Sequence, residues 1–423
     1  MALVAAAALA GWSYLRAGQD IILPFPPLMA DWQPHVGPGT PLAMLIAALV
    51  ALRGPGLAQR MSWRPLLLLT WAAALGWTLS LALIDGWASG VAGRLTTSDE
   101  YLHDVPRVGD IGAMMRTFSD HILTDQAVFW TTHVGAHPPG TFLVFVLLDR
   151  IGLGGGGPAG LLVILVGSSA GAAVAVAARA LGAEASARAA LPYLVLFPGA
   201  VWVGVSADGM FAAVLAWGVA LLALGATGHG SRADVAAATG GLLLGFALYM
   251  SYGMTLGMSL PMAVIVRTRR WRAGLIAVLG IAVVAGAFTA AGFWWLTGYH
   301  DLRIIYAASA ALYRPYGYFV WADLAAFACA TGAAVVAGLR RLVRSLPTAA
   351  EWNTTALVLA AALAVGAADL SGLSKAEVER IWLPFGIWLV LACARLPGRH
   401  ARGWLIAQAA LALSVNSLLL TVW

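Results

Sequence analysis

Long apolar runs, separated by short segments that carry arginine, recur along the whole chain. Hydrophobic residues make up 61% of the 423 positions, charged residues only 10%, and the mean hydropathy is +0.83. A soluble protein of this length could not bury so much apolar surface, because roughly half apolar is usual for globular chains. The sequence therefore predicts an all-α integral membrane protein that crosses the bilayer many times.

Several of the apolar runs are shorter than the ~20 residues that a straight span needs, so some helices are expected to be broken or tilted. We expect a polytopic bundle of about 11–14 membrane helices that forms a single transmembrane domain over residues 1–423. No soluble domain and no fixed-period repeat stands out. The runs are 1–14, 40–53, 65–84, 140–153, 159–178, 189–205, 209–226, 237–251, 253–267, 273–297, 318–338, 354–370, 382–396 and 403–422.

The net charge of +6 does not indicate nucleic-acid binding, because the arginines lie in short clusters between apolar runs. Such clusters normally mark cytoplasmic loops. Placing them in the cytoplasm puts the segments 85–139, 298–317 and 371–381 on the external face. The clusters are Arg53, Arg60 and Arg64; Arg267, Arg269, Arg270 and Arg272; Arg340, Arg341 and Arg344; and Arg395, Arg399 and Arg402.

The middle of the chain leaves two alternatives open. Arg179 and Arg188 favour a cytoplasmic loop near 179–188, so that the short run 140–153 cannot cross the membrane simply. This run is either re-entrant, or it ends in a turn inside the membrane at the glycine-rich stretch 152–157.

The segment 85–139 is the richest in acids and contains a helical pattern. Seven of the 19 acidic residues lie in it. Over about 110–122, apolar residues recur at helical spacing with polar residues on the other side, and Asp110 is placed to cap the first turn. The pattern predicts an amphipathic juxtamembrane helix that lies in the membrane interface. Acids therefore gather on one face, where a site would be built.

Asp99 and Glu100 form an acidic pair within this segment. A carboxylate held at a membrane surface acts as a general base on an acceptor hydroxyl, or binds a divalent cation such as Mg²⁺ or Mn²⁺. The alternative is that these acids are simply solvated. Asp104 is a third candidate for the base, with a structural role in a turn as its alternative.

His133 and His137 lie four residues apart, directly before Pro138 and Pro139. On a helix this spacing would place both imidazoles on one face for a metal ion, but Gly135 and the prolines argue against a regular helix. Each is also a candidate donor to a substrate or a phosphate, and a purely structural role is the remaining alternative. The prolines suit the sharp start of a helix after His137.

Asp208 lies between two apolar runs, where a carboxylate is costly unless it faces a cavity or a partner. Its alternative is a cap for the helix that begins at Gly209. Arg314 is a candidate for binding phosphate through its bidentate fork. Tyr313 and Tyr316 beside it are candidates for stacking on a sugar or for lying among lipid headgroups.

The stretch 372–385 carries charged residues directly before an apolar run. Ser374 and Glu377 fit a capping box, which would account for Glu377 without a function. Arg380 suits a lipid-linked phosphate at the bilayer surface, with a snorkelling side chain as the alternative. Glu379 is counted with it among the candidate substrate contacts.

These features together resemble the C-type glycosyltransferase superfamily, which includes the protein O-mannosyltransferases and the aminoarabinose transferases. The matching pieces are the acidic pair Asp99-Glu100, the helix 110–122, His137-Pro138-Pro139 and the stretch around Asp208, over residues 80–230. The resemblance implies a sugar transferase whose donor is a polyprenyl-phosphate sugar and whose site lies on the external face. It also implies that an acid of the first loop is the base, that basic residues hold the departing phosphate, and that some members use a divalent metal. Unlike many members of that superfamily, this chain is expected to carry no soluble C-terminal domain.

The expected function is the transfer of a mannose-like or arabinose-like sugar from a polyprenyl-phosphate donor to a lipid, glycan or protein acceptor of the cell envelope. The expected location is the plasma membrane. The alternative is a transporter or flippase of a lipid-linked substrate, which would need polar groups near the membrane midplane with access to both sides. A non-catalytic assembly subunit is the third reading, and it would tolerate the loss of all the loop acids.

Overall fold

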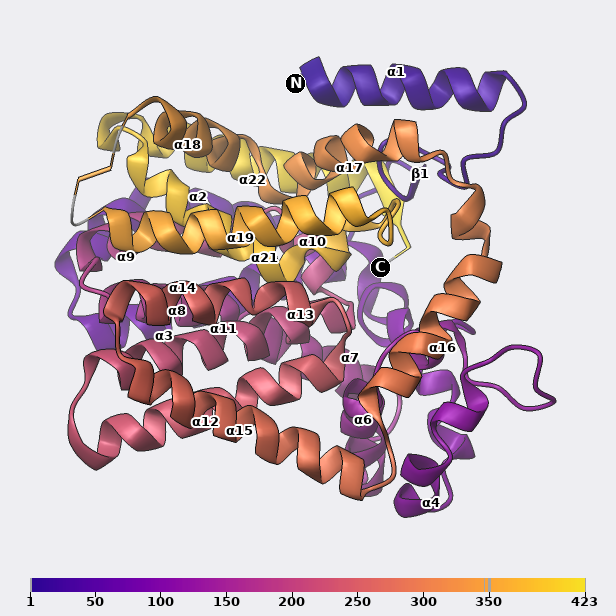
Figure 1. Ribbon diagram of the computed structural model, residues 1–423. Helices are drawn as coiled ribbons and strands as arrows, with labels where there is room; N and C mark the ends of the chain where they lie inside the picture. The colour runs from indigo at the N-terminus through magenta and orange to yellow at the C-terminus, as the bar shows by residue number, and fades with distance from the viewer. Residues whose placement is uncertain (1, 346, 349–350, 423) are drawn as a thin grey trace.

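The computed structural model describes residues 2–345, 347–348 and 351–422 as a bundle of α-helices that lie side by side (Figure 1). It confirms the predicted all-α polytopic class. Met1, the first residue of the predicted run 1–14, and Trp423, the last residue of the predicted domain, lie outside the described residues.

The helices and strands follow one another with few long connections. In chain order they are α1 (Ala2–Arg16), β1 (Ala30–Trp32), α2 (Thr40–Arg60), α3 (Trp63–Ala82), α4 (Ile111–Arg116), α5 (Thr132–Gly135), α6 (Gly140–Arg150), α7 (Gly156–Gly167), α8 (Ala170–Ala180), α9 (Glu184–Val195), α10 (Ala200–Val203), α11 (Ala207–Thr227), α12 (Gly230–Met250), α13 (Met254–Gly257), α14 (Ser259–Thr268), α15 (Trp271–Ala290), α16 (Trp295–Ala308), α17 (Tyr316–Thr331), α18 (Ala333–Arg344), α19 (Trp352–Ser371), α20 (Val378–Ile381), α21 (Leu383–Leu389), α22 (Ala401–Leu418) and β2 (Leu419–Thr421).

Seven spans among the described residues are long and apolar enough to cross a membrane, or eight if the bent pair α17 and α18 is one span. This is fewer than the 11–14 predicted, because several of the apolar runs form helices that are too short to cross alone. Short apolar helices cover Ala2–Arg16, Met254–Thr268 and Leu383–Arg395. The seven spans are Thr40–Arg60, Trp63–Asp85, Gly156–Ala180, Ala207–Thr227, Gly230–Met250, Trp271–Ala290 and Trp352–Ser371.

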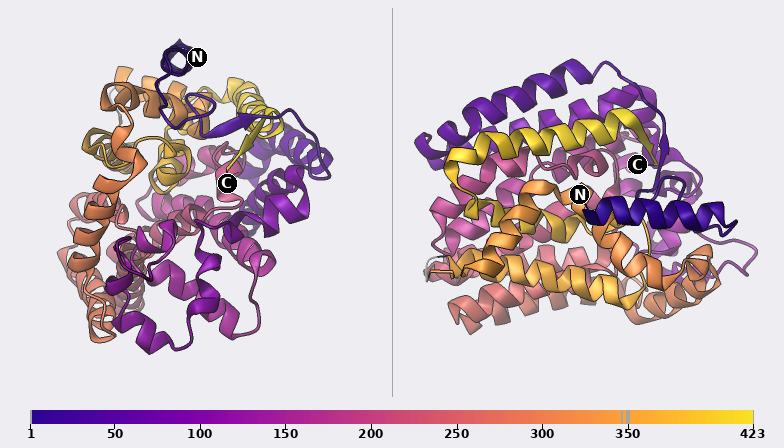
Figure 2. Two further views of the ribbon diagram at one scale, coloured as in Figure 1. Left: turned by 90° about the vertical axis from the view of Figure 1, so that its right-hand side faces the viewer. Right: turned by 90° about the horizontal axis from the view of Figure 1, so that it is seen from above.

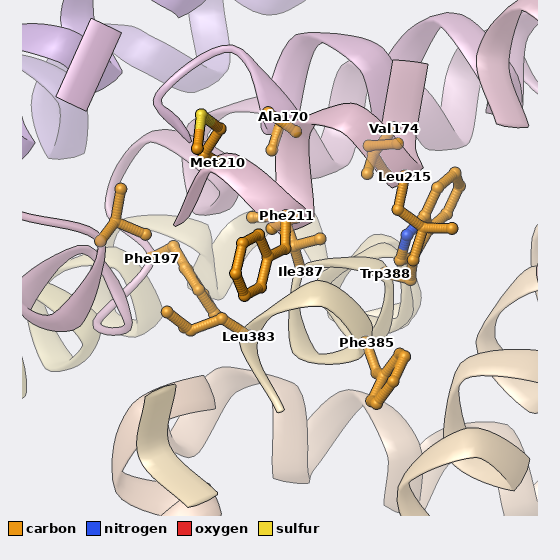
Figure 3. Close-up of a cluster of buried hydrophobic side chains, with 14 of the residues drawn as sticks. Ala170, Val174, Phe197, Met210, Phe211, Leu215, Leu383, Phe385, Ile387 and Trp388 are labelled. Carbon is orange, nitrogen blue, oxygen red and sulfur yellow. The ribbon is translucent and has the colours of Figure 1, made fainter. Parts of the chain in front are cut away.

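Helix α11 is the centre of the bundle, since 78% of its most apolar stretch is buried against only 22% in α2 and in α15. Figure 3 shows its Phe211 and Leu215 among the side chains of Ile387 and Trp388 from α21. Small residues let α12 approach α11 closely: a Cβ on Gly240 would lie 2.8 Å from the carbonyl oxygen of Gly218. Close helix packing through small residues is how membrane helices gain dispersion contacts without a hydrophobic driving force between them.

The two ends of the bundle differ in character. The end on the right of Figure 1 carries loops and short helices, and Figure 2 (left) looks directly onto it. We call it the loop end. Hydrogen bonds tie the segments 85–139, 298–317 and 371–381 together there, from Arg380 to His133 and from Arg314 to the carbonyl of Lys375. The β1–β2 ladder joins the two ends of the chain at the same place.

The opposite end, which we call the arginine end, is where α2 ends and α19 begins. Arg188 donates to the carbonyl oxygen of Ala58 at 2.7 Å, and Asn353 donates to that of Leu181 at 2.5 Å. These contacts hold the helix ends together. The clusters that the sequence assigns to the cytoplasm therefore gather at one end of the bundle, on the left of Figure 1.

Two segments differ from their predicted form. The helix expected over 110–122 is only the short α4, followed by a 3₁₀ turn at Ser119–His121. Its apolar residues Met115 and Phe118 are buried in the protein core and do not face lipid. The predicted capping role of Asp110 is confirmed, since its Oδ1 accepts from the N–H of Ala113 at 2.6 Å.

The run 140–153 is not among the spans that are long and apolar enough to cross a membrane. It forms the 11-residue helix α6, which lies at the loop end (Figure 1) and packs against α12 and the 3₁₀ turns Tyr101–His103 and Val105–Arg107. Arg150 at its C-terminus donates to the carbonyl oxygens of Val108 and Gly109, which holds the helix against the loop segment.

Candidate functional site

A buried ion-pair cluster lies at the loop end, where the first turn of α11 meets α20. Asp208 is the second residue of α11, whose N-cap is Ser206, so the predicted capping role for Asp208 is wrong. Its Oδ2 accepts from Nη1 of Arg380 at 2.8 Å. Both side chains are less than one-tenth exposed, and such a buried pair persists only when each charge is matched.

Glu377 is the second carboxylate on Arg380. Its Oε2 accepts from Nη2 of Arg380 at 2.7 Å, and its Oε1 lies 3.6 Å from Nη2 of Arg314. Burial would raise the pKa of this carboxyl, but Arg380 and Arg314 outweigh burial and hold the pKa below its ordinary value. Glu377 is therefore ionised and shares two guanidinium groups.

The predicted capping box at Ser374 and Glu377 is wrong. The backbone of Glu377 has φ 61°, and its side chain makes no capping bond. The hydroxyl oxygen of Ser374 instead accepts from the indole N–H of Trp382 at 3.1 Å. The sequence reasoning thus missed Glu377 as a member of the site. The signal that could have found it is the spacing of three residues to Arg380, which places both side chains on one helical face.

His133 links the cluster to the acidic pair. Nη2 of Arg380 donates to its Nε2 at 3.0 Å, so the imidazole carries its proton on Nδ1 and donates it to the carbonyl oxygen of Asp99 at 2.7 Å. The same Nδ1 lies 3.5 Å from Oε1 of Glu100. Glu100 is only 3% exposed, although it belongs to a loop.

An aromatic wall backs this arrangement. The rings of His133 and His137 stack with centroids 6.3 Å apart, and His137 also contacts Tyr101 and Phe211. Burial and the neighbouring His133 lower the pKa of His137 to about 4, so this imidazole is neutral at pH 7. Its Nδ1 donates to the carbonyl oxygen of His133 at 2.8 Å, which leaves Nε2 as an acceptor.

Tyr101 is a second residue that the sequence reasoning missed. Its ring is almost fully buried against His133, His137 and Phe145. Burial, reinforced by the charge of Glu100, raises the pKa of its phenol well above the ordinary value. Tyr101 follows the acidic pair directly in the sequence, but an aromatic residue at that position does not by itself indicate a site residue.

Asp99 and Asp104 lie outside the ion-pair cluster. Oδ1 of Asp99 accepts from the hydroxyl of Thr132 at 2.9 Å. Asp104 is fully buried and is occupied on both oxygens, by Nη1 of Arg107 at 2.6 Å and by the N–H of Thr131 at 2.7 Å. Both acids thus hold the loop in shape, and of the three candidate bases only Glu100 lies beside the cluster.

Arg314 lies at the edge of the cluster together with Lys375. Nη1 of Arg314 donates to the carbonyl oxygen of Lys375, and Nζ of Lys375 donates to that of Arg314 at 2.8 Å. Nε of Arg314 is buried and has no hydrogen-bond partner among the described residues. Burial, with Arg314 nearby, lowers the pKa of the lysine. Lys375 is a further residue that the sequence reasoning did not assign to the site.

The two predicted tyrosines face outward near these cations. Tyr313 is 77% exposed, and Tyr316 is 45% exposed with its hydroxyl bonded to the carbonyl oxygen of Leu370. Glu379 points elsewhere: it is fully buried, and its Oε1 accepts from the N–H of Met29 at 3.1 Å. Burial raises the pKa of Glu379 to about 7.

The donor set does not fit a metal ion. Among the described residues no three His, Cys, Asp or Glu side chains gather in an arrangement that could hold one. The carboxylates of Asp208 and Glu377 share the guanidinium of Arg380 as their counter-charge. The reaction proposed for this site therefore uses no metal.

Comparison with family models, with curated proteins and with solved structures gave no match to this chain.

Proposed function

We propose that the chain is a membrane glycosyltransferase that moves one sugar from a polyprenyl-phosphate donor to an acceptor hydroxyl, with its site at the loop end. The observation that carries the proposal is the convergence of Glu100, His133 and Arg380, from segments far apart in the sequence, beside the cations Arg314 and Lys375. A base next to a phosphate-binding group is what transfer from a sugar phosphate requires.

Glu100 is the proposed general base. It accepts the proton of the acceptor hydroxyl, the oxygen attacks the anomeric carbon, and the bond from that carbon to the phosphate oxygen breaks. The bonding electron pair leaves with the polyprenyl phosphate. His133 is the proposed positioning residue for Glu100, because its Nδ1 donates to the carbonyl oxygen of the neighbouring Asp99 and lies 3.5 Å from Oε1 of Glu100. Asp208 and Glu377 favour the positive charge that develops on the sugar ring.

Arg314 and Lys375 are the proposed phosphate contacts. The third proton of the Lys375 ammonium remains available as a donor among the described contacts, and Arg314 adds its positive charge beside it. The sequence suggested that Arg380 binds the phosphate, but its guanidinium already binds the carboxylates of Asp208 and Glu377. We assign it to positioning Asp208 and Glu377.

The surroundings of these cations suit a lipid-linked phosphate. Leu312, whose carbonyl oxygen accepts from Nζ of Lys375, is exposed, and so are Leu370 and Leu373, which lie within five residues of Lys375 in the sequence. Exposed apolar side chains beside a cationic group match an amphiphile with a phosphate head and a hydrocarbon tail. The arginines at the opposite end support an external position for the loop end and a site at the plasma membrane surface.

The alternative function is transport of a lipid-linked substrate. A transporter needs polar groups near the midplane, with access to both sides. In the seven long spans the charged residues lie close to the helix ends, with Arg53 in α2 as the exception. The candidate site likewise uses the first turn of α11 and not its middle. This placement favours the enzyme over the transporter.

The test is a transfer assay in membranes with radiolabelled polyprenyl-phosphate mannose and polyprenyl-phosphate arabinose. Glu100→Gln removes the base and keeps the shape of the side chain, so we expect transfer to fall at least ~100-fold, as for the loss of a general base. Asp99→Asn is the matched control in the neighbouring position, and it should keep most of the activity, because Asp99 offers His133 only its backbone carbonyl.

Two results would contradict the proposal. If Glu100→Gln transfers as well as the wild type at equal expression, Glu100 is not the base. If the wild type transfers neither sugar but moves the labelled lipid across reconstituted vesicles, the transporter function takes its place.

A further inference from the structure

A pocket at the arginine end collects positive charge from several elements. Its volume is about 1170 Å³, and it is bounded by α18, the start of α19, the 3₁₀ turns Val390–Arg395 and Gly398–His400, and α22. The charged residues that line it are Arg340, Arg341, Arg344, Arg395, Arg399 and Glu351. None of its lining residues belongs to the candidate site around Asp208 and Arg380, so the two are separate.

Glu351 neutralises only one of these positive charges. Its Oε1 accepts from Nη1 of Arg395 at 2.8 Å, and its Oε2 accepts from both the N–H and the hydroxyl of Thr348. Both oxygens are thus used by the wall of the pocket itself. Five arginines against one glutamate leave a formal excess of four positive charges around one cavity.

Arg395 supplies a donor without an acceptor. Its side chain is 13% exposed, and its Nη2 is buried without a hydrogen-bond partner among the described residues. Buried donors are normally paired, and a small rotation of the side chain toward the pocket would let an anion oxygen satisfy this one. The remaining arginines stand at the rim, where Arg340, Arg344 and Arg399 are exposed.

The fold fixes the shape of the pocket. α18 departs from α17 by 110° at Gly332, whose φ of 90° suits glycine. The side chain of Gln408 in α22 bonds to both sides of this break, accepting from the N–H of Ala334 at 3.2 Å and donating to the carbonyl oxygen of Thr331 at 3.0 Å. The arginines of α18 are therefore held against α22 by a specific joint.

The bias of cytoplasmic loops toward arginine does not by itself explain a pocket. Other arginines at the same end are engaged by neighbouring side chains: Arg188 pairs with Glu184, Arg272 with Asp234, and Arg267 with Asn353. The arginines of the pocket instead converge on one cavity whose single carboxylate is already occupied.

We propose that this pocket binds a phosphate anion, presented either by a lipid headgroup or free in solution. Guanidinium groups bind phosphate oxygens in a bidentate fork, and several of them together favour a ligand with more than one negative charge. Val336 and Val343 on α18 are exposed apolar residues, and they would bring a headgroup in the membrane within reach of the arginines. The proposal does not depend on the proposed glycosyltransferase function.

The experiment titrates delipidated full-length protein in neutral detergent and follows its thermal unfolding midpoint. One arm adds inorganic pyrophosphate, and the other adds phosphatidylglycerol, with phosphatidylcholine as the neutral lipid. The test variant is Arg344→Gln with Arg399→Gln, since both side chains are exposed and make no contact with Glu351. The matched control is Arg60→Gln with Arg64→Gln, two exposed arginines at the same end that do not line the pocket.

We expect the midpoint of the wild type to rise with at least one of the two phosphate ligands. The test variant should weaken the apparent Kd roughly tenfold or more, equivalent to about 1.4 kcal/mol, and the control should bind like the wild type. A response to the lipid alone assigns the pocket to a headgroup, and a response to pyrophosphate assigns it to a soluble phosphate. The proposal is overturned if neither ligand raises the midpoint, or if test and control variants weaken binding equally.

Discussion

Nη1 of Arg380 lies 2.8 Å from Oδ2 of Asp208, and this bond joins two residues that are 172 positions apart. It ties the first turn of α11, at the centre of the bundle, to α20 at the loop end. Both partners are buried, so the pair organises the candidate site and also contributes to the stability of the fold.

Breaking this pair from one side should destabilise the protein. We expect Arg380→Gln to cost about 3–5 kcal/mol, because the carboxylate of Asp208 is left buried and unpaired. The double variant Asp208→Asn with Arg380→Gln should be more stable than the sum of the single losses predicts. Thermal unfolding in detergent measures all three variants. Additive losses would show that the two side chains are not coupled.

Protonation of His137 should lower the stability of the folded protein in mild acid. Its pKa is about 4 in the folded protein against 6.5 for an ordinary histidine. The unfolded chain therefore binds the proton first, and the stabilisation is present above pH 6.5 and is lost as the pH falls toward 4. His137→Asn does not titrate, so its unfolding midpoint should fall less between pH 7 and pH 4.5. Parallel pH profiles of variant and wild type would contradict this assignment.

Glu379 should give the opposite pH dependence. Its pKa is raised to about 7, against 4.5 for an ordinary glutamate. Its contribution is fully present below pH 4.5 and is lost as the pH rises through 7, because the folded protein must then hold a buried charge. Glu379→Gln should therefore gain stability relative to the wild type between pH 5 and pH 8. The measurement is the difference in unfolding midpoint across that range, and a constant difference would show that Glu379 does not titrate there.

Gly240 should tolerate no side chain, whereas Gly286 should accept one. A Cβ on Gly240 would meet the backbone of α11 at 2.8 Å, while a Cβ on Gly286 has no neighbour within 4 Å. We expect Gly240→Ala to cost about 1–3 kcal/mol through overpacking. Gly286→Ala, in the exposed helix α15, should be neutral or stabilising by up to about 1 kcal/mol. Equal unfolding midpoints for the two variants would contradict the close packing of α11 and α12.

The local chemistry of the sequence determined the class of the fold and the position of several site residues. Apolar composition requires membrane helices, and arginine clusters gathered at one end as expected from loop charges alone. His133, Asp208 and Arg380 were identifiable because a charge or an imidazole next to an apolar run is costly unless it has a partner. Asp110 was identifiable as a cap because capping depends on residues only three apart.

Only the tertiary structure decided which of these residues meet and which apolar runs form helices long enough to cross a membrane. Asp99, Glu100 and Asp104 look alike in the sequence, and they were separated by contacts with Thr132, His133 and Arg107 that no local pattern encodes. Glu377 fitted a local capping box in the sequence. In the structure it pairs instead with the guanidinium groups of Arg380, three residues away, and of Arg314, from a distant segment. The physical reason is the same in each case: helix and cap formation depend on neighbours along the chain, whereas a buried charge takes the partner that folding brings to it.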